Sequence, residues 1–341
     1  MDIVFCINNN WSMQCGVTIK SILEFNKSPI TFHIFSKNIT NENKNRLIKI
    51  VNETSNNSIK FYIISDDYDD KFVLRSGDRV SIETYYRFFI SSLLDNTIEK
   101  VLYLDADIIC VDKLDNLFDI DLTNYAAGMV LDSRYCEITK YNRLNYDIKY
   151  GYYNSGVMLL NLKYWRDNNI SQKLIDYVCN NKELCYYHDQ DAINALLHDK
   201  ILRLTPSFNI QTVLMQYFFL KDYLTCPRSI QYDFKYEKKL WAELELALNS
   251  PKLIHFTEFY KPWHKTCKLP FTELWRFFLL QTDWKNFKLS KYIYPKKVHY
   301  KNEIKRFISK INKAKCSFDN FPMEMYQVEK KIILKLTSKG K

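Results

Sequence analysis

Residues 102–110 read LYLDADIIC, and this stretch joins a buried strand to a pair of carboxylates. The residues at 101–104 are apolar on both faces, which is typical of a central strand covered on both sides of its sheet. Side chains two positions apart in an extended segment point the same way, so Asp105 and Asp107 converge beside the strand end. Oxygen ligands of this kind suit Mg²⁺ or Mn²⁺ that also contacts phosphate. Two interpretations stay open from this stretch alone: the pair caps a strand end, or it holds a metal ion.

The D-x-D spacing is weak by itself because it occurs four times in the chain. The other three pairs are Asp67/Asp69, Asp119/Asp121 and Asp189/Asp191. Most such pairs are solvated loop charges. The Asp105/Asp107 pair differs because it directly follows a buried apolar run, and this context favours it as the functional pair.

Strands and helices alternate around this stretch. Periodicity predicts strands at 2–7, 30–36, 59–65, 101–104, 156–162 and 252–256, and helical segments at 11–26, 40–51, 81–89, 163–180 and 190–198. Such alternation is typical of an α/β domain with a mostly parallel sheet, in which ligands bind beyond the carboxyl ends of the strands. Residues 8–11 and Asp105 lie at such ends.

Composition narrows the class of protein. The 341 residues are 47% hydrophobic, enough for one large domain with an appendage or for two domains. The N-terminal MDIVFCINNN lacks the basic and apolar regions of a signal peptide, and no stretch approaches the roughly 18 apolar residues of a membrane span. We therefore expect a cytosolic protein, or one bound to a membrane from the cytosolic side. Nine scattered cysteines without a C-x-x-C pair argue for free thiols, and no G-x-G-x-x-G dinucleotide fingerprint is present.

A second group of candidates lies in HFTEFYKPWH, residues 255–264. Taken alone, His255 is more easily explained as a core histidine at a strand end, and Lys261 as a surface lysine. Further polar candidates are Asn154 and Ser155 before a strand, Asp189 and Gln190 at the start of a helix, and Arg87 among aromatic residues. Loop amides and a helix N-cap are the ordinary explanations of the first two groups. Arg87 either snorkels to the surface or reaches a diphosphate with its planar fork.

Six segments taken together resemble one family. In chain order they are MDIVF, TYYRF, KVLYLDADI, YYNSGVMLLNLKYWR, YHDQDAINAL and HFTEFYKPWH. They are similar to glycosyltransferase family 8, the retaining enzymes of the GT-A fold, and above all to bacterial lipooligosaccharide and lipopolysaccharide galactosyl- and glucosyltransferases. The resemblance spans residues 1–264. It implies an α/β fold with a Rossmann-like, mostly parallel central sheet and flanking helices.

The resemblance also implies a role for each matching residue. Asp105, Asp107 and His255 resemble the protein ligands of a Mn²⁺ ion, with Mg²⁺ as the alternative. Trp11 matches an aromatic residue that stacks on uracil, and Lys261 matches a lysine on the diphosphate of a UDP-sugar. The other implied donor-binding residues are Asn8, Asn10, Arg87, Asp105, Ala106, Asn154, Ser155, Asp189 and Gln190, and the implied catalytic residues are Gln190, Asp189 and Arg87.

Two residues depart from the family's pattern. Asn8 stands where relatives often carry aspartate, although an amide also offers donors and acceptors to the uracil edge. Glu258 stands where the family usually has a glycine close to the diphosphate. A carboxylate there faces phosphate charge unless it points away or contacts the metal.

Positive charge is concentrated at the C-terminal end of the chain. Residues 281–341 hold 16 Lys and Arg against 5 Asp and Glu, whereas residues 1–280 hold 33 against 34. Basic and aromatic residues interleave at 283–315, which favours docking on an anionic membrane surface over a solvated tail or an RNA-binding segment. We expect no nucleic-acid partner.

These patterns predict two parts of the chain. The first is a GT-A domain at 1–268, with a nucleotide-binding half at about 1–110 and an acceptor-side half at about 111–268. The second is a basic, aromatic, helical tail at 269–341.

The predicted function is a retaining hexosyltransferase. It moves galactose or glucose from a UDP-sugar to a saccharide or glycolipid acceptor, such as a lipopolysaccharide core, at the inner face of the cytoplasmic membrane. A protein- or self-glycosylating transferase is the alternative within the enzyme class. A non-catalytic UDP-sugar-binding protein and a metal-dependent phosphohydrolase are the rivals outside it.

Overall fold

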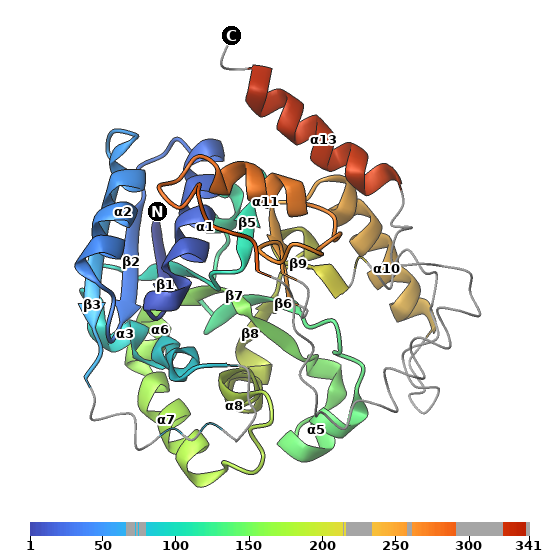
Figure 1. Cartoon of the computed structure of the whole chain (residues 1–341). Coiled ribbons are helices and arrows are strands. Elements are labelled where there is room, and N and C mark those ends of the chain that lie inside the picture. The colour runs from blue at the N-terminus through green and yellow to red at the C-terminus, as the bar shows by residue number, and fades with distance from the viewer. Residues whose placement is uncertain are drawn as a thin grey trace.

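The computed structural model describes residues 1–65, 72, 74, 80–213, 215, 234–257, 261–290 and 323–338, without the side chains at 234–239, 241 and 323–326. Three predictions fall outside these ranges: the pair Asp67/Asp69, Glu258, and most of the membrane-docking segment at 283–315. The described residues form a layered α/β structure with helices on both sides of a central sheet (Figure 1).

Seven of the described strands form the central sheet, in the order β3-β2-β1-β4-β7-β6-β8. They are β1 (Asp2–Cys6), β2 (Thr31–Ser36), β3 (Ser58–Ile63), β4 (Lys100–Leu104), β6 (Ala127–Leu131), β7 (Tyr153–Asn161) and β8 (Ile201–Arg203). Neighbouring strands run parallel, except that β7 is antiparallel to both β4 and β6. The predicted α/β class with a mostly parallel sheet is confirmed.

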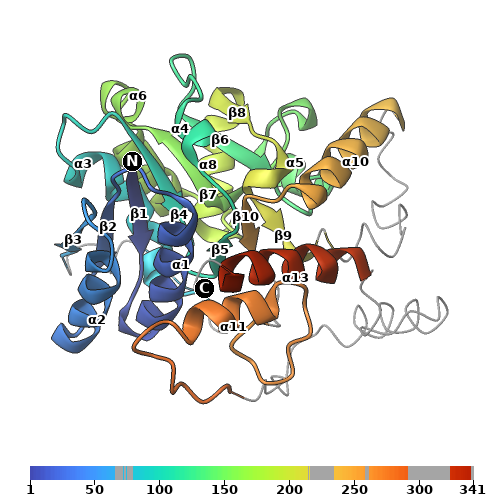
Figure 2. The same ribbon diagram turned by 90° about the horizontal axis from the view of Figure 1, so that it is seen from above.

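Strand β4 shows why both faces of the sheet are covered. Its side chains alternate, so Val101 and Tyr103 enter one core while Leu102 and Leu104 enter the other. The first core is closed by η3 (Ile82–Phe89), α3 (Ile90–Leu93), α6 (Leu162–Asp167), α7 (Ile170–Asn180) and α8 (His188–Leu197), and the second by α1 (Ser12–Phe25) and α2 (Asn41–Asn52). Figure 2 shows α1 and α2 on one side of the sheet and α6 and α8 on the other.

A second, three-stranded sheet lies beside the first. Its order is β5-β10-β9, with β5 at Ile108–Cys110, β10 at Leu253–His255 and β9 at Ile210–Gln211. Only three residues, 105–107, separate β4 from β5, so the turn that carries Asp105 and Asp107 lies between the two sheets. The shorter elements are η1 (Asn9–Trp11), α4 (Asp115–Phe118), α5 (Ile138–Leu144), η4 (Ile148–Tyr150), η5 (His198–Lys200) and η6 (Pro206–Phe208).

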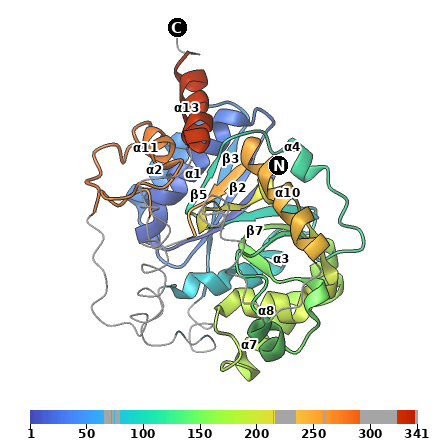
Figure 3. The same cartoon turned by 90° about the vertical axis from the view of Figure 1, so that its right-hand side faces the viewer.

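Three later helices lie on the outside of this arrangement: α10 (Phe234–Asn249), α11 (Thr272–Leu279) and α13 (Met323–Ser338) (Figure 3). Helix α11 packs on α1, where the rings of Phe278 and Phe25 meet edge to face at 6.4 Å. Helix α13 packs on α11, and Glu329 accepts a hydrogen bond from the Leu274 N–H at 2.9 Å. The first part of the predicted tail is thus packed on the core. The boundary at residue 268 stays a prediction.

Three local expectations are wrong. The helix predicted at 163–180 is two helices, because Asn169 between them adopts a left-handed φ of 53°, which asparagine tolerates better than most residues. Asn154 and Ser155 lie inside β7 and not in a loop before it. Cys136 is disulfide-bonded.

Most of the described cysteines are free thiols, as the sequence predicted. Among the described cysteines, the free thiols are Cys6, Cys15, Cys110, Cys179, Cys185 and Cys267. Burial raises the pKa of the Cys110 thiol to about 12, so it stays protonated. In the described part of the chain, none of the helices combines the length and apolar character that a membrane crossing needs.

Candidate active site

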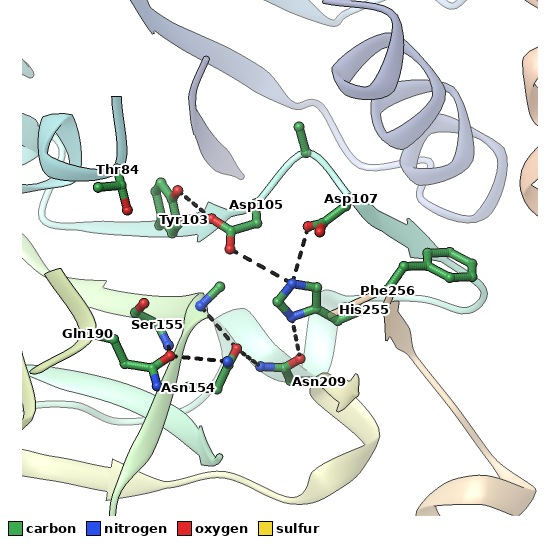
Figure 4. A network of polar contacts seen from close by, with 12 residues as sticks. Thr84, Tyr103, Asp105, Asp107, Asn154, Ser155, Gln190, Asn209, His255 and Phe256 are labelled. Atoms are coloured by element: carbon green, nitrogen blue, oxygen red, sulfur yellow. Dashed lines mark hydrogen bonds and ion pairs between the residues drawn. The ribbon is translucent and has the colours of Figure 1, made fainter. Parts of the chain in front are cut away.

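Asp105, Asp107 and His255 come together where the two sheets meet (Figure 4). The Asp105 N–H donates to the carbonyl of Gly156 at 2.8 Å, which ties the end of β4 to β7. The Phe256 N–H donates to the carbonyl of Asp107 at 3.0 Å, which ties the end of β10 to the same turn. One ligand atom from each of the three side chains lies within 4.8 Å of the others. The strand-end carboxylates therefore meet the histidine that the sequence singled out.

A polar chain behind His255 orients its ring. Nε2 lies 3.2 Å from Asp107 Oδ1 and 3.8 Å from Asp105 Oδ2. Nδ1 lies 3.1 Å from Asn209 Oδ1, and Asn209 Nδ2 in turn donates to Asn154 Oδ1 at 2.9 Å. Because Asn209 presents its oxygen to the ring, Nδ1 carries a proton. Nε2 is then the ring nitrogen that faces the two aspartates.

Gly156 provides the space that these side chains occupy. A β-carbon at this position would lie 2.3 Å from Cε1 of His255 and 2.7 Å from Oδ2 of Asp105. Both distances are too short for any side chain, so glycine is required where β7 passes the cluster.

Lys261 brings a positive charge to the same cluster. Its Nζ lies 2.7 Å from Asp107 Oδ2 and also donates to the carbonyl of Phe256. Burial acts to raise the pKa of Asp107, but Lys261 and His255 outweigh it and hold the pKa well below its ordinary value. Asp107 is therefore a carboxylate at neutral pH, which is the form that binds a metal ion.

Arg87 joins Asp105 to Asp189 from inside the protein. Nη2 donates to Asp105 Oδ1 at 3.1 Å, and Nη1 donates to Asp189 Oδ2 at 2.9 Å and to the Ser155 carbonyl at 2.8 Å. Nε donates to the carbonyl of Thr84 at 2.8 Å. Burial acts to lower the pKa of Arg87, but the two carboxylates more than offset it and the pKa is raised. Arg87 is thus a buried cross-link between carboxylates and does not snorkel.

Asp189 and Gln190 lie in the first turn of α8, after the N-cap residue Tyr187. Asp189 is not the cap; its Oδ2 accepts the Ser155 hydroxyl at 2.8 Å. The side-chain oxygen of Gln190 accepts the Ser155 N–H at 3.0 Å and Nδ2 of Asn154 at 3.2 Å. These four predicted residues therefore share one hydrogen-bond network, which continues to His255 through Asn154.

The predicted nucleotide-side residues follow β1. Asn8 Nδ2 donates to Glu83 Oε2 at 3.2 Å, and Asn8 Oδ1 accepts the Asn10 N–H at 3.1 Å. The rings of Trp11 and Trp263 meet edge to face at 5.6 Å. The loop after β1 thus touches the KPWH segment that carries Lys261.

Ala106 lies between the two aspartates of the turn. Its carbonyl accepts the Thr18 hydroxyl at 3.0 Å, which fastens the turn to helix α1. The turn between the two aspartates is therefore held against helix α1.

Three residues of this network were not predicted. The Tyr103 hydroxyl donates to Asp105 Oδ1 at 2.6 Å, and its ring lies 4.3 Å from the Arg87 guanidinium. Asn209 orients His255, yet no pattern around it distinguishes it from an ordinary loop residue. Asp132 belongs to the network because its Oδ2 accepts hydrogen bonds from Asn154 Nδ2 and Gln190 Nε2, each at 3.3 Å. It does have a sequence signal, because it follows the buried run of β6 just as Asp105 follows β4.

The residues present fit a divalent cation. Two carboxylates and an imidazole form a donor set of oxygen and nitrogen, which suits a metal of the Mn²⁺ type better than one that prefers sulfur. The lowered pKa of Asp107, the orientation of His255 Nε2 and the close approach that Gly156 permits agree with an ion held among the three side chains.

Comparison with known proteins identifies the family. The family model described as Glycosyl transferase family 8 matches residues 2–267. The chain belongs to glycosyltransferase family 8. The resemblance drawn from the six sequence segments is thereby confirmed.

Curated relatives of this family 8 enzyme include lipopolysaccharide glycosyltransferases. Lipopolysaccharide 1,2-glucosyltransferase of Escherichia coli (strain K12) is 28% identical over 289 residues, which cover 84% of this chain and 79% of the relative. Lipopolysaccharide 1,3-galactosyltransferase of Salmonella typhimurium is 26% identical over 278 residues, which cover 80% and 75%. General stress protein A of Bacillus subtilis is 27% identical over 289 residues, which cover 83% and 94%.

Among solved structures, the galactosyltransferase LgtC in complex with donor and acceptor sugar analogs has a TM-score of 0.71 to this chain. The two are 23% identical, and the likeness covers 89% of this chain and 100% of that chain. The GT-A fold predicted from the sequence is confirmed.

Proposed function

We propose that this family 8 glycosyltransferase moves galactose or glucose from a UDP-sugar to a saccharide acceptor, with retention at the anomeric carbon and with Mn²⁺ on the diphosphate. The observation that carries the proposal is the convergence of Asp105, Asp107 and His255 beside Lys261. The relatives named as lipopolysaccharide glucosyl- and galactosyltransferases support a hexose donor and a lipopolysaccharide or lipooligosaccharide core as acceptor.

Asp105, Asp107 and His255 would hold the cation, and Mg²⁺ is the alternative to Mn²⁺. When bound, the cation supplies Lewis-acid stabilisation of the negative charge that develops on departing UDP. Lys261, next to Asp107, places a further positive charge at the same edge for the diphosphate. With these charges in place, the leaving group needs no proton from a general acid.

The remaining donor contacts are proposed by position. Trp11 stacks on uracil, and Asn8 and Asn10 contact the base and ribose. Ala106 touches the ribose. The donor sugar is surrounded by Arg87, Asn154, Ser155, Asp189 and Gln190.

Retention results when the acceptor hydroxyl attacks on the face that UDP leaves. The anomeric C–O bond breaks, the sugar gains oxocarbenium character, and a phosphate oxygen of UDP accepts the hydroxyl proton. A double displacement needs an enzyme nucleophile instead. The Gln190 amide is a poor nucleophile whose oxygen already accepts two hydrogen bonds, and Asp191 is fully buried against Arg143. Both observations favour the same-face route.

UDP release from a panel of UDP-sugars tests this function. Wild-type protein with Mn²⁺ should slowly hydrolyse one UDP-hexose, and EDTA or the Asp107→Ala substitution should abolish release. Lipopolysaccharide cores would then be tested as acceptors. UDP binding that requires Mn²⁺, without turnover of any donor or acceptor, would contradict catalysis and indicate a binding protein.

We also propose that the protein acts at the cytoplasmic face of an anionic membrane. The excess of Lys and Arg after residue 280 supports this location. Wild-type protein should sediment with anionic liposomes and be released by salt. A variant with glutamine at the lysines of 296–315 should stay in solution, and equal sedimentation of the two would contradict the proposal.

A further inference from the structure

Lys261 begins the KPWH segment, residues 261–264, and its backbone is tied to His264 in both directions. The Lys261 N–H donates to His264 Nδ1 at 3.1 Å, and the His264 N–H donates to the Lys261 carbonyl at 2.8 Å. Burial and the charge of Lys261 lower the pKa of His264, so its ring is neutral at pH 7 and Nδ1 can accept this hydrogen bond. A shift of His264 therefore moves the backbone from which the Lys261 ammonium reaches Asp107.

Arg276 on helix α11 contacts the same segment through two carbonyl groups. Its Nε donates to the Pro262 carbonyl at 3.2 Å, and its Nη2 donates to the His264 carbonyl at 2.9 Å. Its Nη1 lies 2.6 Å from Glu273 Oε1, three residues earlier on the helix. Hydrogen bonds from a charged donor are stronger than those between neutral groups. The planar guanidinium thus fixes the carbonyls on both sides of Trp263 at once.

Helix α11 is itself held at its beginning and along its side. Its N-cap residue, Phe271, makes no side-chain cap hydrogen bond, and Glu329 of α13 accepts the Leu274 N–H at 2.9 Å. The ring centroid of the buried Trp275 lies 5.5 Å from that of Trp263. Arg276 therefore extends from a helix that already packs against the segment it contacts.

The side chain of Lys261 is fixed at its tip by the Asp107 carboxylate and the Phe256 carbonyl. A lysine has a flexible four-carbon stem, so the position of its ammonium also depends on where its backbone lies. The bonds to His264 set that backbone, and Arg276 sets His264. These contacts form a continuous path from α11 to the carboxylate of the metal cluster.

We propose that Arg276 is a positioning residue of the donor site, which holds the KPWH segment so that Lys261 meets the diphosphate of the UDP-sugar. This assignment rests on the proposed function, because it is the diphosphate that gives Lys261 its role there. A group held in its bound position before the ligand arrives loses less freedom on binding. Arg276 therefore strengthens donor binding through Lys261 and not through a contact of its own.

Titration calorimetry with UDP and Mg²⁺ on wild type, Arg276→Ala, Lys261→Ala and the double variant tests this role. Arg276→Ala should weaken UDP binding about fivefold, because Lys261 must then be ordered when the ligand binds. In the Lys261→Ala background the same substitution should change the affinity by less than about twofold, because the residue it acts through is gone. Arg276→Lys keeps one charged donor and should bind UDP with an affinity between those of wild type and Arg276→Ala. If Arg276→Ala does not fold, the same cycle is measured with Arg276→Lys.

Arg166 of α6 supplies the matched control, because it also donates to backbone carbonyls. Its Nε lies 2.9 Å from the Ser91 carbonyl oxygen, and its Nη1 lies 3.0 Å from that of Ile98. Arg166→Ala should lower the urea concentration at which half of the protein unfolds and leave the affinity for UDP within about twofold of wild type.

Three results would each refute the positioning role while the transferase function stands. They are wild-type affinity in Arg276→Ala, equal losses with and without Lys261, and a loss in Arg166→Ala as large as that in Arg276→Ala. Unchanged UDP binding in Lys261→Ala would also refute it, because Arg276 would have nothing to act through. If wild-type protein does not bind UDP in the presence of Mg²⁺, the proposed function itself fails.

Discussion

Two D-x-D pairs in this chain have the same spacing and opposite surroundings. Asp105 and Asp107 follow strand β4, and their side chains are 30% and 13% exposed. Asp189 and Asp191 lie in the first turn of helix α8, and their side chains are 5% and 0% exposed. The first pair faces the imidazole of His255. The two aspartates of the second pair form ion pairs with Arg87 and Arg143 inside the protein.

Secondary structure explains the difference. Residues two apart on a strand share a side, whereas on a helix they project about 200° apart. Asp189 therefore turns to Arg87, while Asp191 turns to Arg143, which it contacts at 2.7 Å. The comparison teaches that the spacing of two carboxylates predicts a shared ligand only when they lie on a strand or in an extended turn.

The largest effect is expected from the helical pair. Asp191→Ala removes the partner of Arg143 and of the Tyr152 hydroxyl, which donates to Asp191 at 2.8 Å. We expect the free energy of unfolding to fall by about 3 kcal/mol, because a buried charge loses its partner. Asp107→Ala should change it by about 1 kcal/mol or less. Urea denaturation in EDTA measures the free energy of unfolding of both variants. Equal losses would contradict the view that the helical pair is structural and the strand-end pair is not.

Substitution of Gly156 by alanine tests how closely β7 packs against Asp105 and His255. Gly156→Ala should lower the free energy of unfolding by about 2 kcal/mol, because the new β-carbon overlaps His255 and Asp105. The matched control is Gly128→Ala on neighbouring strand β6, where the β-carbon meets only the flexible end of Leu204 at 3.1 Å. A smaller loss is expected there, and a loss as large as that of Gly156→Ala would count against a specific clash.

Asn209 tests whether the polar chain behind His255 serves the metal. Asn209→Leu should weaken Mn²⁺ binding about tenfold, because the imidazole loses the hydrogen bond that fixes its tautomer and orientation. Asn209→Asp keeps an acceptor at Nδ1 and should bind more tightly than Asn209→Leu. Titration calorimetry with Mn²⁺ compares them, and unchanged affinity in Asn209→Leu would show that the chain only supports the fold.

The smallest effect is a pH dependence at Asp132. Its pKa is lowered in the folded protein, so its ionised form adds stability above the ordinary aspartate pKa, and this contribution is lost as the pH falls through the folded value. The free energy of unfolding of wild type should therefore exceed that of Asp132→Asn by about 1 kcal/mol at neutral pH. This difference should disappear below about pH 4. Denaturation across this range measures the gap. A gap that widens in acid would contradict the lowered pKa.

The fold was largely readable because its elements are strongly patterned. Strand β4 is predicted at 101–104 and observed at Lys100–Leu104, since apolar residues on both faces leave few other structures. The break between α6 and α7 was missed because one left-handed Asn169 decides it, and asparagine is common within helices as well. Helix α10 was missed in a region where the sequence showed no recognisable motif.

Site residues that lie at strand ends could be predicted from the sequence. Those whose role depends on contacts with residues far along the chain could not. Asp105, Asp107 and His255 were found from their strand-end positions and the family resemblance. Asn209 acts through contacts with Asn154 and with a ring that lies 46 residues further along the chain, so no local pattern could reveal it. Asp132 had a readable signal, the apolar run before it, and was still overlooked.

Binding of Mn²⁺, followed by electron paramagnetic resonance of the free ion, tests the central claim most directly. Wild-type protein, Asp107→Asn and Asp189→Asn would be titrated side by side, with circular dichroism to confirm folding. We predict that Asp107→Asn abolishes the tight site and that Asp189→Asn retains it. Loss of the site in Asp189→Asn, or tight binding in folded Asp107→Asn, would contradict the assignment of the metal to the strand-end pair.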